Sequence, residues 1–275
     1  MTRQLIVNAD DYGRTRLVSA GIRSAHINGI VTSTTAMMNI PGVEEDLEKT
    51  LRECPDMGIG VHLVLTAGEP LAAKEKVLSL IDEAGSFPSA KGFLDHLATI
   101  NIDQVQIEWD KQIQKFVQLT GKSPDHLDSH HHTSYFTAEL FKVMLEFADI
   151  HQCFIRRPLV EGGQSLPKDF PSELVNQAVD FIPALIAQNS PRMPDSFYTS
   201  FFGQNATLDQ LLEIIGGLQE GTSEIMCHPG FNNPELEKCS SYNKQRDRER
   251  EILEDILLRT HLSDLGIKLI NFGDL

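Results

Sequence analysis

The sequence has little of what marks exported, membrane-bound or disulfide-stabilised proteins. It holds four cysteines in 275 residues, none in a CxxC pair, which argues against a disulfide framework, a thioredoxin-like site or a structural zinc knuckle. No stretch approaches the roughly 18 consecutive apolar residues of a membrane span. The first residues also lack the long apolar run of a signal peptide. We therefore expect a soluble protein of a reducing compartment, the cytoplasm.

Basic residues are also scarce. The chain has 24 Lys and Arg against 39 Asp and Glu, a formal net charge of −15. Such a surface repels phosphate backbones and anionic lipids, so we expect neither nucleic acid nor a membrane among the partners. No Gly-rich phosphate fingerprint follows the first strand-like run, which weakens a nucleotide-binding fold. The hydrophobic fraction of 41% is ordinary for a globular protein.

The sequence does contain a regular alternation of short apolar runs and amphipathic segments. The strand-like runs are Leu5–Asn8, Thr32–Met38, Gly58–Leu63, His126–Ser129, Cys153–Arg156, Ser196–Tyr198, Glu224–Cys227 and Ile267–Asn271. The helical segments are Thr15–Asn28, Gly42–Cys54, Ile102–Thr120, Phe136–Asp149, Leu208–Leu218 and Lys244–Leu262. This alternation predicts βαβ units and a parallel sheet. Seven or eight units predict an α/β fold, a single distorted TIM-like (β/α) barrel over residues 1–275, with a doubly wound open sheet as the alternative.

Two Gly- and Pro-containing stretches interrupt the alternation, near residues 67–99 and 162–194. Long excursions on the catalytic face of a barrel often form substrate walls, and peripheral decoration is an equal alternative. The run from Lys244 to Glu251 mixes charges of both signs. We interpret that run as the solvent-exposed face of a helix rather than a binding patch.

Four polar clusters stand at the ends of strand-like runs. They are Asn8-Ala-Asp10-Asp11, Val61-His62, Asp128-Ser-His130-His131-His132 and Cys227-His228-Pro229. The C-terminal ends of barrel strands converge on one face, so side chains about 60 and 120 positions apart can meet in one pocket. One Asp and two His form a common ligand set for a catalytic divalent ion and leave positions for water and substrate.

The adjacent Asp10 and Asp11 would point to opposite faces of a regular strand. If the chain turns there, both reach the pocket, where one can bind the ion and the other can accept a proton. The structural alternative for this pair is an Asx turn or a helix N-cap. For His62 taken alone, the alternative is a hydrogen-bonded core histidine.

Three consecutive histidines follow the strand-like run at His126–Ser129. Imidazoles are costly to leave unpaired at a buried strand end, which favours a ligand role for His130. The side chains of His131 and His132 cannot both share its direction. We therefore expect at least one of them to support the site rather than bind the ion.

Five strings of the sequence resemble the YdjC-like carbohydrate deacetylases, a family that includes the chito-oligosaccharide deacetylases. The strings are Ile6–Gly13, Gly29–Thr35, Gly60–Leu63, His126–His132 and Glu224–Gly230. They occur in the family's order and cover most of the chain. The two excursions match less clearly, and the resemblance makes them the expected specificity determinants.

The resemblance implies one divalent cation, Mg²⁺ or Zn²⁺, held by Asp11, His62 and His130. It places Asp10 in the position of the general base and His228 in that of the general acid. It also implies hydrolysis of the N-acetyl group from N-acetylglucosamine units of short chitin-derived sugars such as diacetylchitobiose, with release of acetate. A homodimer is an expectation that only the resemblance carries.

Two other functions stay open on the sequence alone. A barrel metallo-phosphoesterase or amidohydrolase would use the same ion on another small substrate, although the acidic surface and the missing phosphate loop disfavour a phosphoester. A non-catalytic sugar-binding barrel is the second, and the complete set of acidic and histidine residues disfavours it. The identity of the metal is also open, because two histidines suit zinc whereas magnesium prefers oxygen ligands.

Overall fold

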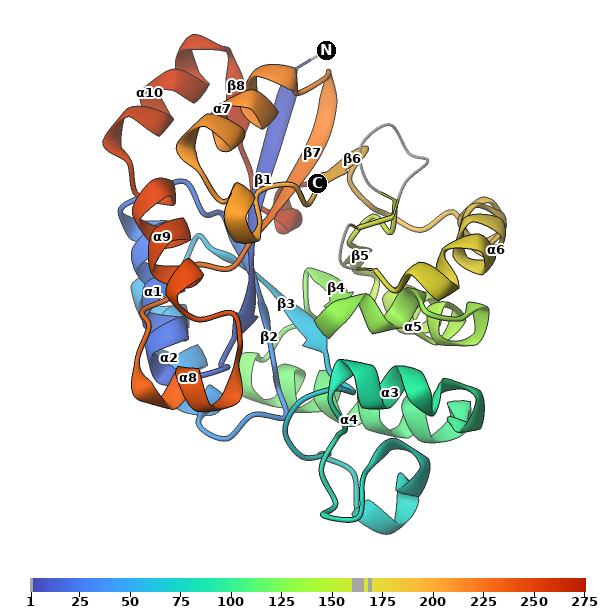
Figure 1. Ribbon diagram of the computed structural model, residues 1–275. Helices are drawn as coiled ribbons and strands as arrows, with labels where there is room; N and C mark the ends of the chain where they lie inside the picture. The colour runs from blue at the N-terminus through green and yellow to red at the C-terminus, as the bar shows by residue number, and fades with distance from the viewer. Residues whose placement is uncertain (1, 160–165, 168–169) are drawn as a thin grey trace.

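A computed structural model describes residues 2–159, 166–167 and 170–275 of the chain (Figure 1). These residues form one sheet of eight strands, in the order β5-β4-β3-β2-β1-β7-β6 with β8 beside β1, and every pairing is parallel. The strands are β1 (Arg3–Tyr12), β2 (Ser33–Ala36), β3 (Gly58–Leu63), β4 (His126–Ser129), β5 (Phe154–Ile155), β6 (Ser196–Tyr198), β7 (Gly221–Cys227) and β8 (Ile267–Leu269). The predicted α/β class and distorted barrel are confirmed.

The two edge strands, β5 and β6, close the barrel incompletely. Where they approach, the described residues show a hydrogen bond from the Ile155 N–H to the Arg192 carbonyl (2.9 Å) instead of a strand pairing. Arg192 lies just before β6. The sheet is therefore a distorted barrel that is open between β5 and β6, the two ends of the strand order.

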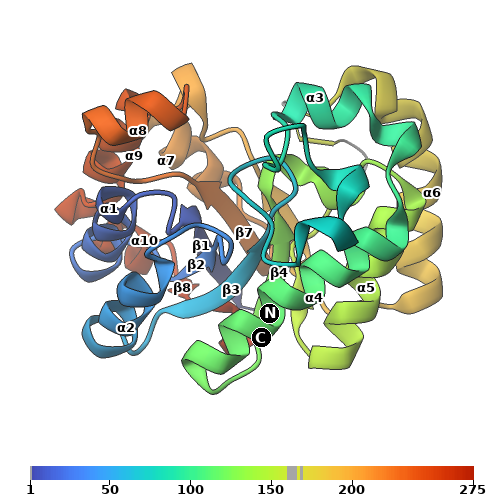
Figure 2. The same cartoon turned by 90° about the horizontal axis from the view of Figure 1, so that it is seen from below.

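Helices cover the outside of the sheet in two groups (Figures 1 and 2). Helices α1, α2, α8, α9 and α10 lie on one side, and α3, α4, α5 and α6 lie on the other. Their bounds are α1 (Arg16–Ile27), α2 (Val43–Glu53), α3 (Ala90–Asp95), α4 (Ile102–Thr120), α5 (Ala138–His151), α6 (Val175–Asn189), α7 (Leu208–Gly217), α8 (Pro234–Cys239), α9 (Lys244–Leu253) and α10 (Ile256–Asp264). No described helix is both long enough and apolar enough to cross a membrane.

Threonine caps explain where three of these helices begin. The side chains of Thr15, Thr137 and Thr207 each accept a hydrogen bond from the backbone N–H three residues later. Such a cap satisfies a donor that the first helical turn leaves free. The prediction of a single helix over Lys244–Leu262 is wrong. Helix α9 ends at Leu253, and the side chain of Asp255 caps a new helix, α10.

Strand β1 is longer than the sequence predicted. It runs through Asp10 and Asp11 to Tyr12, and its pairing with β2 shifts between Ala9 and Tyr12. Two residues of β1 there lie opposite one residue of β2, which is a β-bulge. Asp11 takes a left-handed backbone (φ 69°). The bulge is the turn that lets both carboxylates face the same cluster.

The two faces of β1 differ in chemistry. The odd-numbered residues from Leu5 to Ala9 join the main apolar core beneath the helices. On the alternate face Ile6 packs in a small cluster with residues near the C-terminus, and Asn8 and Asp10 follow it. The inside of the barrel is thus apolar at the start of β1 and polar at its end, where buried groups need partners.

The first predicted excursion, residues 67–99, is an ordered segment with short helices. It contains α3 and the short 3₁₀ turns η1 (Lys74–Lys76), η2 (Leu78–Leu80) and η3 (Leu97–Thr99). The buried carboxylate of Glu108 on α4 accepts the backbone N–H groups of Leu71 (3.1 Å) and Ala72 (2.8 Å). Part of the second excursion, residues 162–165 and 168–169, lies outside the described residues. A substrate-wall role for either excursion stays a prediction.

Candidate active site

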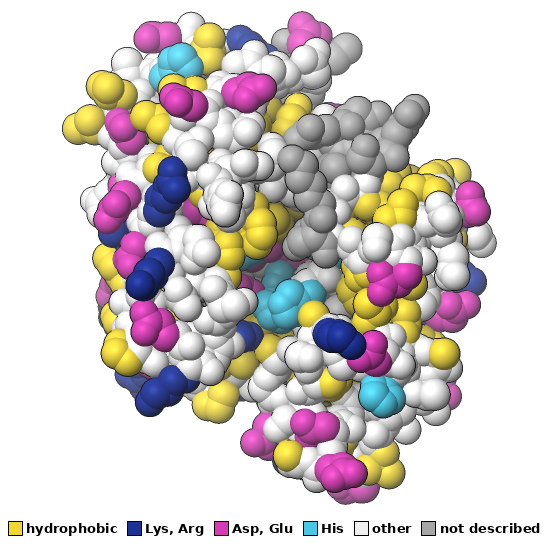
Figure 3. All heavy atoms as spheres, in the orientation of Figure 1, with side chains coloured by type: hydrophobic (Ala, Val, Ile, Leu, Met, Phe, Trp, Pro, Cys, Tyr) yellow, Lys and Arg dark blue, Asp and Glu magenta, His cyan; other side chains and the backbone are white. Residues whose placement is uncertain are grey.

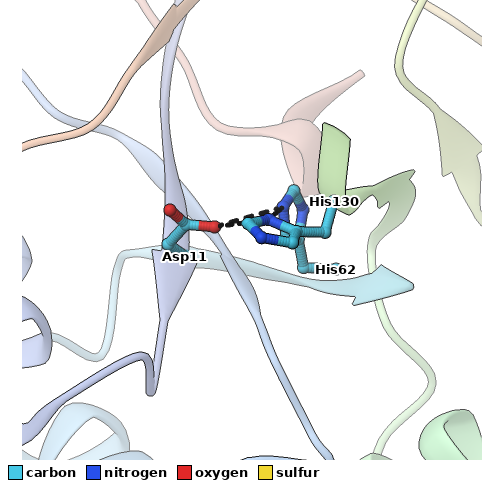
Figure 4. Close-up of side chains that lie close together, drawn as sticks. All are labelled: Asp11, His62 and His130. Carbon is cyan, nitrogen blue, oxygen red and sulfur yellow. Dashed lines mark hydrogen bonds and ion pairs between the residues drawn. The ribbon is translucent and has the colours of Figure 1, made fainter. Parts of the chain in front are cut away.

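Three predicted ligands meet at the C-terminal ends of their strands (Figure 4). Asp11 lies on β1, His62 on β3, and His130 opens the 3₁₀ segment η4 (His130–Tyr135) directly after β4. The Asp11 Oδ1 atom is 3.0 Å from His130 Nδ1 and 3.4 Å from His62 Nε2, and the two nitrogens are 3.3 Å apart. All three side chains are buried. Histidine side chains are visible at the floor of a central hollow (Figure 3).

These three atoms fit a divalent cation. Ligand atoms about 2.0–2.2 Å from one ion lie roughly 2.9–3.5 Å apart at octahedral or tetrahedral angles, and the observed separations of 3.0, 3.3 and 3.4 Å match. Among the described residues, no donor satisfies the buried Asp11 Oδ1 with hydrogen-bond geometry. The donor set of one carboxylate and two imidazoles suits zinc and also accommodates other divalent ions.

Asp128 fixes the tautomer of His62. The His62 Nδ1 lies 2.6 Å from Asp128 Oδ1, so this nitrogen carries a proton, and Nε2 is the atom that would bind a cation beside Asp11 and His130. Thr35 Oγ1 donates to the other Asp128 oxygen (3.2 Å). A carboxylate behind a ligating imidazole orients the ring and raises its basicity.

The electrostatics of the cluster favour a positive charge. Burial opposes ionisation of Asp11, but His130 and Arg246 outweigh it and hold the pKa of Asp11 well below its usual value. Burial lowers the pKa of His62, yet Asp128 and Asp11 raise it to about 10. Burial dominates at His130, whose pKa falls to about 4. A cation bound between these groups would replace the proton, and with it the positive charge, that His62 otherwise carries.

A second set of candidate ligands, Asp10, His62 and Asp128, also lies close together. Arg156 occupies its carboxylates. The Arg156 guanidinium donates to both oxygens of Asp10 (2.6 and 2.7 Å) and contacts Asp128 Oδ2 at 2.8 Å. Because these oxygens already have a cationic partner, the first set is the better candidate for a metal site.

Arg156 is the centre of the buried polar network. It follows β5 directly, is fully buried and also donates to Glu224 on β7 (2.8 Å). Its three carboxylate partners outweigh the burial penalty and raise the pKa of Arg156 well above its usual value. Burial raises the pKa of Glu224 to about 7 although Arg156 opposes it. Arg156 and Asp128 both stand at the ends of predicted strands, and that position is the sequence signal from which their part in this network could be predicted.

Asp10 is held from a second direction by Asn8. The Asn8 amide donates to Asp10 Oδ1 (3.0 Å), and its oxygen lies 3.2 Å from His126 Nε2. The His126 ring stacks on Phe272 with centroids 3.7 Å apart. His126 thus has a structural role, and the Asp10 side chain is held in one orientation.

His228 reaches the same cavity from the end of β7. Its Nε2 atom is 4.0 Å from Asp10 Oδ2, and its side chain is 14% exposed. Burial lowers the pKa of His228 to about 4, although Asp10 and Asp11 act in the opposite direction. The aromatic rings of Phe202 and Tyr242 lie beside the imidazole, at centroid distances of 5.2 and 5.4 Å. Asp10 and His228 are therefore close enough to act on one substrate.

His131 and His132 differ in where their rings lie, because that of His131 packs against the ring of His130 with centroids 3.8 Å apart. Both have left-handed backbones, with φ of 55° and 56°, a costly conformation for residues other than glycine. His131 is exposed, and its Nδ1 lies 2.9 Å from Thr66 Oγ1. His132 is buried near the ring of Phe197.

The exposed-face interpretation of the run from Lys244 to Glu251 is wrong for two of its residues. Arg246 is 2% exposed and donates to Asp11 Oδ2. Glu249 is fully buried and accepts hydrogen bonds from the backbone N–H of His228 and the hydroxyl of Tyr242. The two positions are three residues apart and share one helical face, which turns inward while Arg248 stays exposed.

Comparison with known proteins identifies the family. The family model described as YdjC-like protein matches residues 4–264. A carbohydrate deacetylase of Thermoanaerobacter pseudethanolicus is 36% identical, with 98% of each chain covered, and a chitooligosaccharide deacetylase of Yersinia enterocolitica is 32% identical over the full length of both. A crystal structure from Enterococcus faecalis, of a protein provisionally named for cellobiose-phosphate cleavage, superposes with a TM-score of 0.85 at 33% identity, covering 100% of this chain and 99% of that one. The chain therefore belongs to the YdjC-like protein family.

Proposed function

We propose that this protein is a metal-dependent hydrolase that removes the N-acetyl group from an amino sugar. The observation that carries the proposal is the convergence of Asp11, His62 and His130 on one buried point, with Asp10 and His228 beside it. The names of the two deacetylase relatives, which align over nearly the whole chain, support the reaction class.

An amide carbonyl is a weak electrophile and water is a weak nucleophile at neutral pH. A divalent ion bound by Asp11, His62 and His130 would polarise the carbonyl and lower the pKa of a water molecule. Asp10 is our proposed general base. Arg156 and Asn8 hold its carboxylate in one orientation, from which it would accept a proton of the attacking water.

His228 is our proposed general acid. With a pKa of about 4 its imidazole is neutral at pH 7, so it must first gain a proton before it can donate one to the departing amine. Asp10, 4.0 Å away, is the neighbouring group that acquires a proton during attack by water. Movement of that proton from Asp10 through His228 to the amine nitrogen would balance the hydrolysis.

We further propose that the substrate is a short chitin-derived oligosaccharide such as diacetylchitobiose. The named relatives support an acetylated sugar, and the hollow above the histidines provides access from solvent (Figure 3). For the metal we propose Zn²⁺ or Mg²⁺, with the two imidazoles favouring zinc. Elemental analysis of the purified protein distinguishes the two.

The test is mass spectrometry of diacetylchitobiose incubated with the metal-loaded protein and with the protein treated with a chelator. We expect loss of one acetyl mass and release of acetate with the metal-loaded protein alone. Phosphate release from a generic phosphoester, without acetate release, would favour the metallo-phosphoesterase alternative. Metal and sugar binding without turnover would favour a non-catalytic sugar-binding barrel.

A further inference from the structure

From outside the barrel, helix α9 contacts the candidate metal ligand Asp11 and the loop that carries His228. On its inner face, Arg246 donates through Nη2 to Asp11 Oδ2, the oxygen that does not face His62 and His130. The Arg246 Nε donates to the Tyr242 carbonyl (3.0 Å), which fixes the direction of the guanidinium. The guanidinium therefore occupies one Asp11 oxygen and leaves the other for the ligand cluster.

The loop that carries His228 rests on the same helix at two points. The His228 N–H donates to the Glu249 carboxylate, and the Gly230 N–H donates to the Arg246 carbonyl (3.2 Å). On its other side the loop is pressed against α1. A Cβ atom on Gly21 would lie 2.5 Å from the Gly230 Cα, so α1 and this loop approach as closely as only glycine permits.

We propose that α9 is the positioning element of the site. Arg246 restricts Asp11 to binding through one oxygen and holds that oxygen toward His62 and His130. Glu249 holds the backbone from which His228 reaches Asp10. This inference rests on the proposed metal site for its first part and on the proposed reaction for its second. Arg246 and Glu249, two residues of the mixed-charge run from Lys244 to Glu251, thus have separate proposed roles that can be tested independently.

The left-handed backbone of Asp11 makes the first role necessary. At the bulge Asp11 falls outside the regular register with β2, so strand pairing does not set the direction of its carboxylate and side-chain contacts become important. Loss of an outer hydrogen-bond partner of a metal ligand typically costs 10–100-fold in affinity or activity. Arg246 is the outer partner that donates to the Asp11 oxygen turned away from the cluster.

The first experiment measures the affinity of Zn²⁺ by titration calorimetry and the visible spectrum of bound Co²⁺. We expect Arg246→Met to weaken Zn²⁺ binding about 10–100-fold and to change the Co²⁺ spectrum, and Arg246→Lys to fall between. Arg248→Met, on the exposed face of the same helix, is the matched control and should match wild type. Wild-type affinity and spectrum in Arg246→Met would overturn the proposal. If Arg246→Met does not fold, Arg246→Lys decides in the same way.

The second experiment separates the role of Glu249. We expect Glu249→Leu to lower kcat at least tenfold while Zn²⁺ affinity and KM stay within twofold of wild type. Glu249→Gln should recover most of that loss, because its amide oxygen can accept the His228 N–H and its NH₂ group can donate to Tyr242. Unchanged kcat in Glu249→Leu, or no recovery in Glu249→Gln, would overturn this role. A wild-type protein that binds Zn²⁺ but has no deacetylase activity would defeat the proposed function and leave the Arg246 experiment decisive.

Discussion

The floor of the barrel and helix α9 build the same site from opposite kinds of sequence. The floor is made at strand ends, where one candidate ligand atom each from Asp11, His62 and His130 converge. Helix α9 comes from a run of mixed charge, yet Arg246 and Glu249 are buried in it. In our proposal the floor supplies the atoms that bind and react, whereas α9 supplies partners that orient them. The difference shows that charge composition predicts exposure poorly where a cluster of opposite charge lies below the helix.

Removing a floor ligand should have the largest effect. In His130→Ala we expect Zn²⁺ binding to weaken by more than the roughly 10–100-fold cost of losing an outer partner, and activity to fall to that of the metal-free protein. Calorimetry and the acetate assay measure both. His131→Asn is the matched control, because Asn tolerates the left-handed backbone and His131 lies outside the proposed ligand set. Equal losses of Zn²⁺ affinity and activity in the two variants would contradict the assignment of His130, rather than His131, as a ligand.

Changing Asp10 should separate chemistry from metal binding within the floor itself. Asp10→Asn keeps the shape of the side chain but removes its capacity to accept a proton. We expect kcat to fall about 10²–10⁴-fold with Zn²⁺ affinity close to that of wild type. Normal acetate release by a folded, metal-loaded Asp10→Asn protein would rule out the base assignment.

The smallest effect expected is a pH dependence of stability that belongs to α9. Burial raises the pKa of Glu249 to about 7, despite the opposing hydrogen bonds from Tyr242 and His228 and the charge of Arg246. The folded state then keeps its proton while the unfolded state loses it near pH 4.5. Wild type should therefore lose stability, relative to Glu249→Gln, as pH rises from about 4.5 to 7, by about 3 kcal/mol in all.

Thermal unfolding of the two proteins, both treated with a chelator, measures that difference across pH 5–8. The wild-type Tm should fall relative to the variant up to about pH 7 and then run parallel to it. Glu224, whose pKa is also raised to about 7, is present in both proteins and cancels in the comparison. A difference in Tm that does not change with pH would mean that Glu249 is ionised in the folded protein throughout the range.

Much of the fold could be predicted from the chain. The alternation of runs gave β3, β4, β6 and α4 at their observed bounds, because buried parallel strands and amphipathic helices have distinct periodicities. The polar residues at strand ends predicted which side chains meet, and Asp11, His62 and His130 do lie together. The roles of these residues, the homodimer and the cytoplasmic location stay predictions.

What the periodicity could not give depends on contacts between distant segments. The extension of β1 through Asp11 follows from a bulge against β2, and the break after Leu253 follows from a cap rather than from a change of apolar period. The inward turn of Arg246 follows from the carboxylate beneath it, 235 positions away in the chain.

Local patterns along the chain are enough to predict the layered α/β architecture and the residues available for chemistry, because short-range periodicity and strand ends are local properties. Which atoms of those residues are free to bind, and which are already paired, follows from the folded arrangement alone. In the folded protein Asp128 pairs with His62, and Arg156 pairs with Asp10. Asp11 Oδ1 has no hydrogen bond among the described residues. The physical reason is that a buried polar group must find its partner in space, and the nearest partner in space is seldom near in sequence.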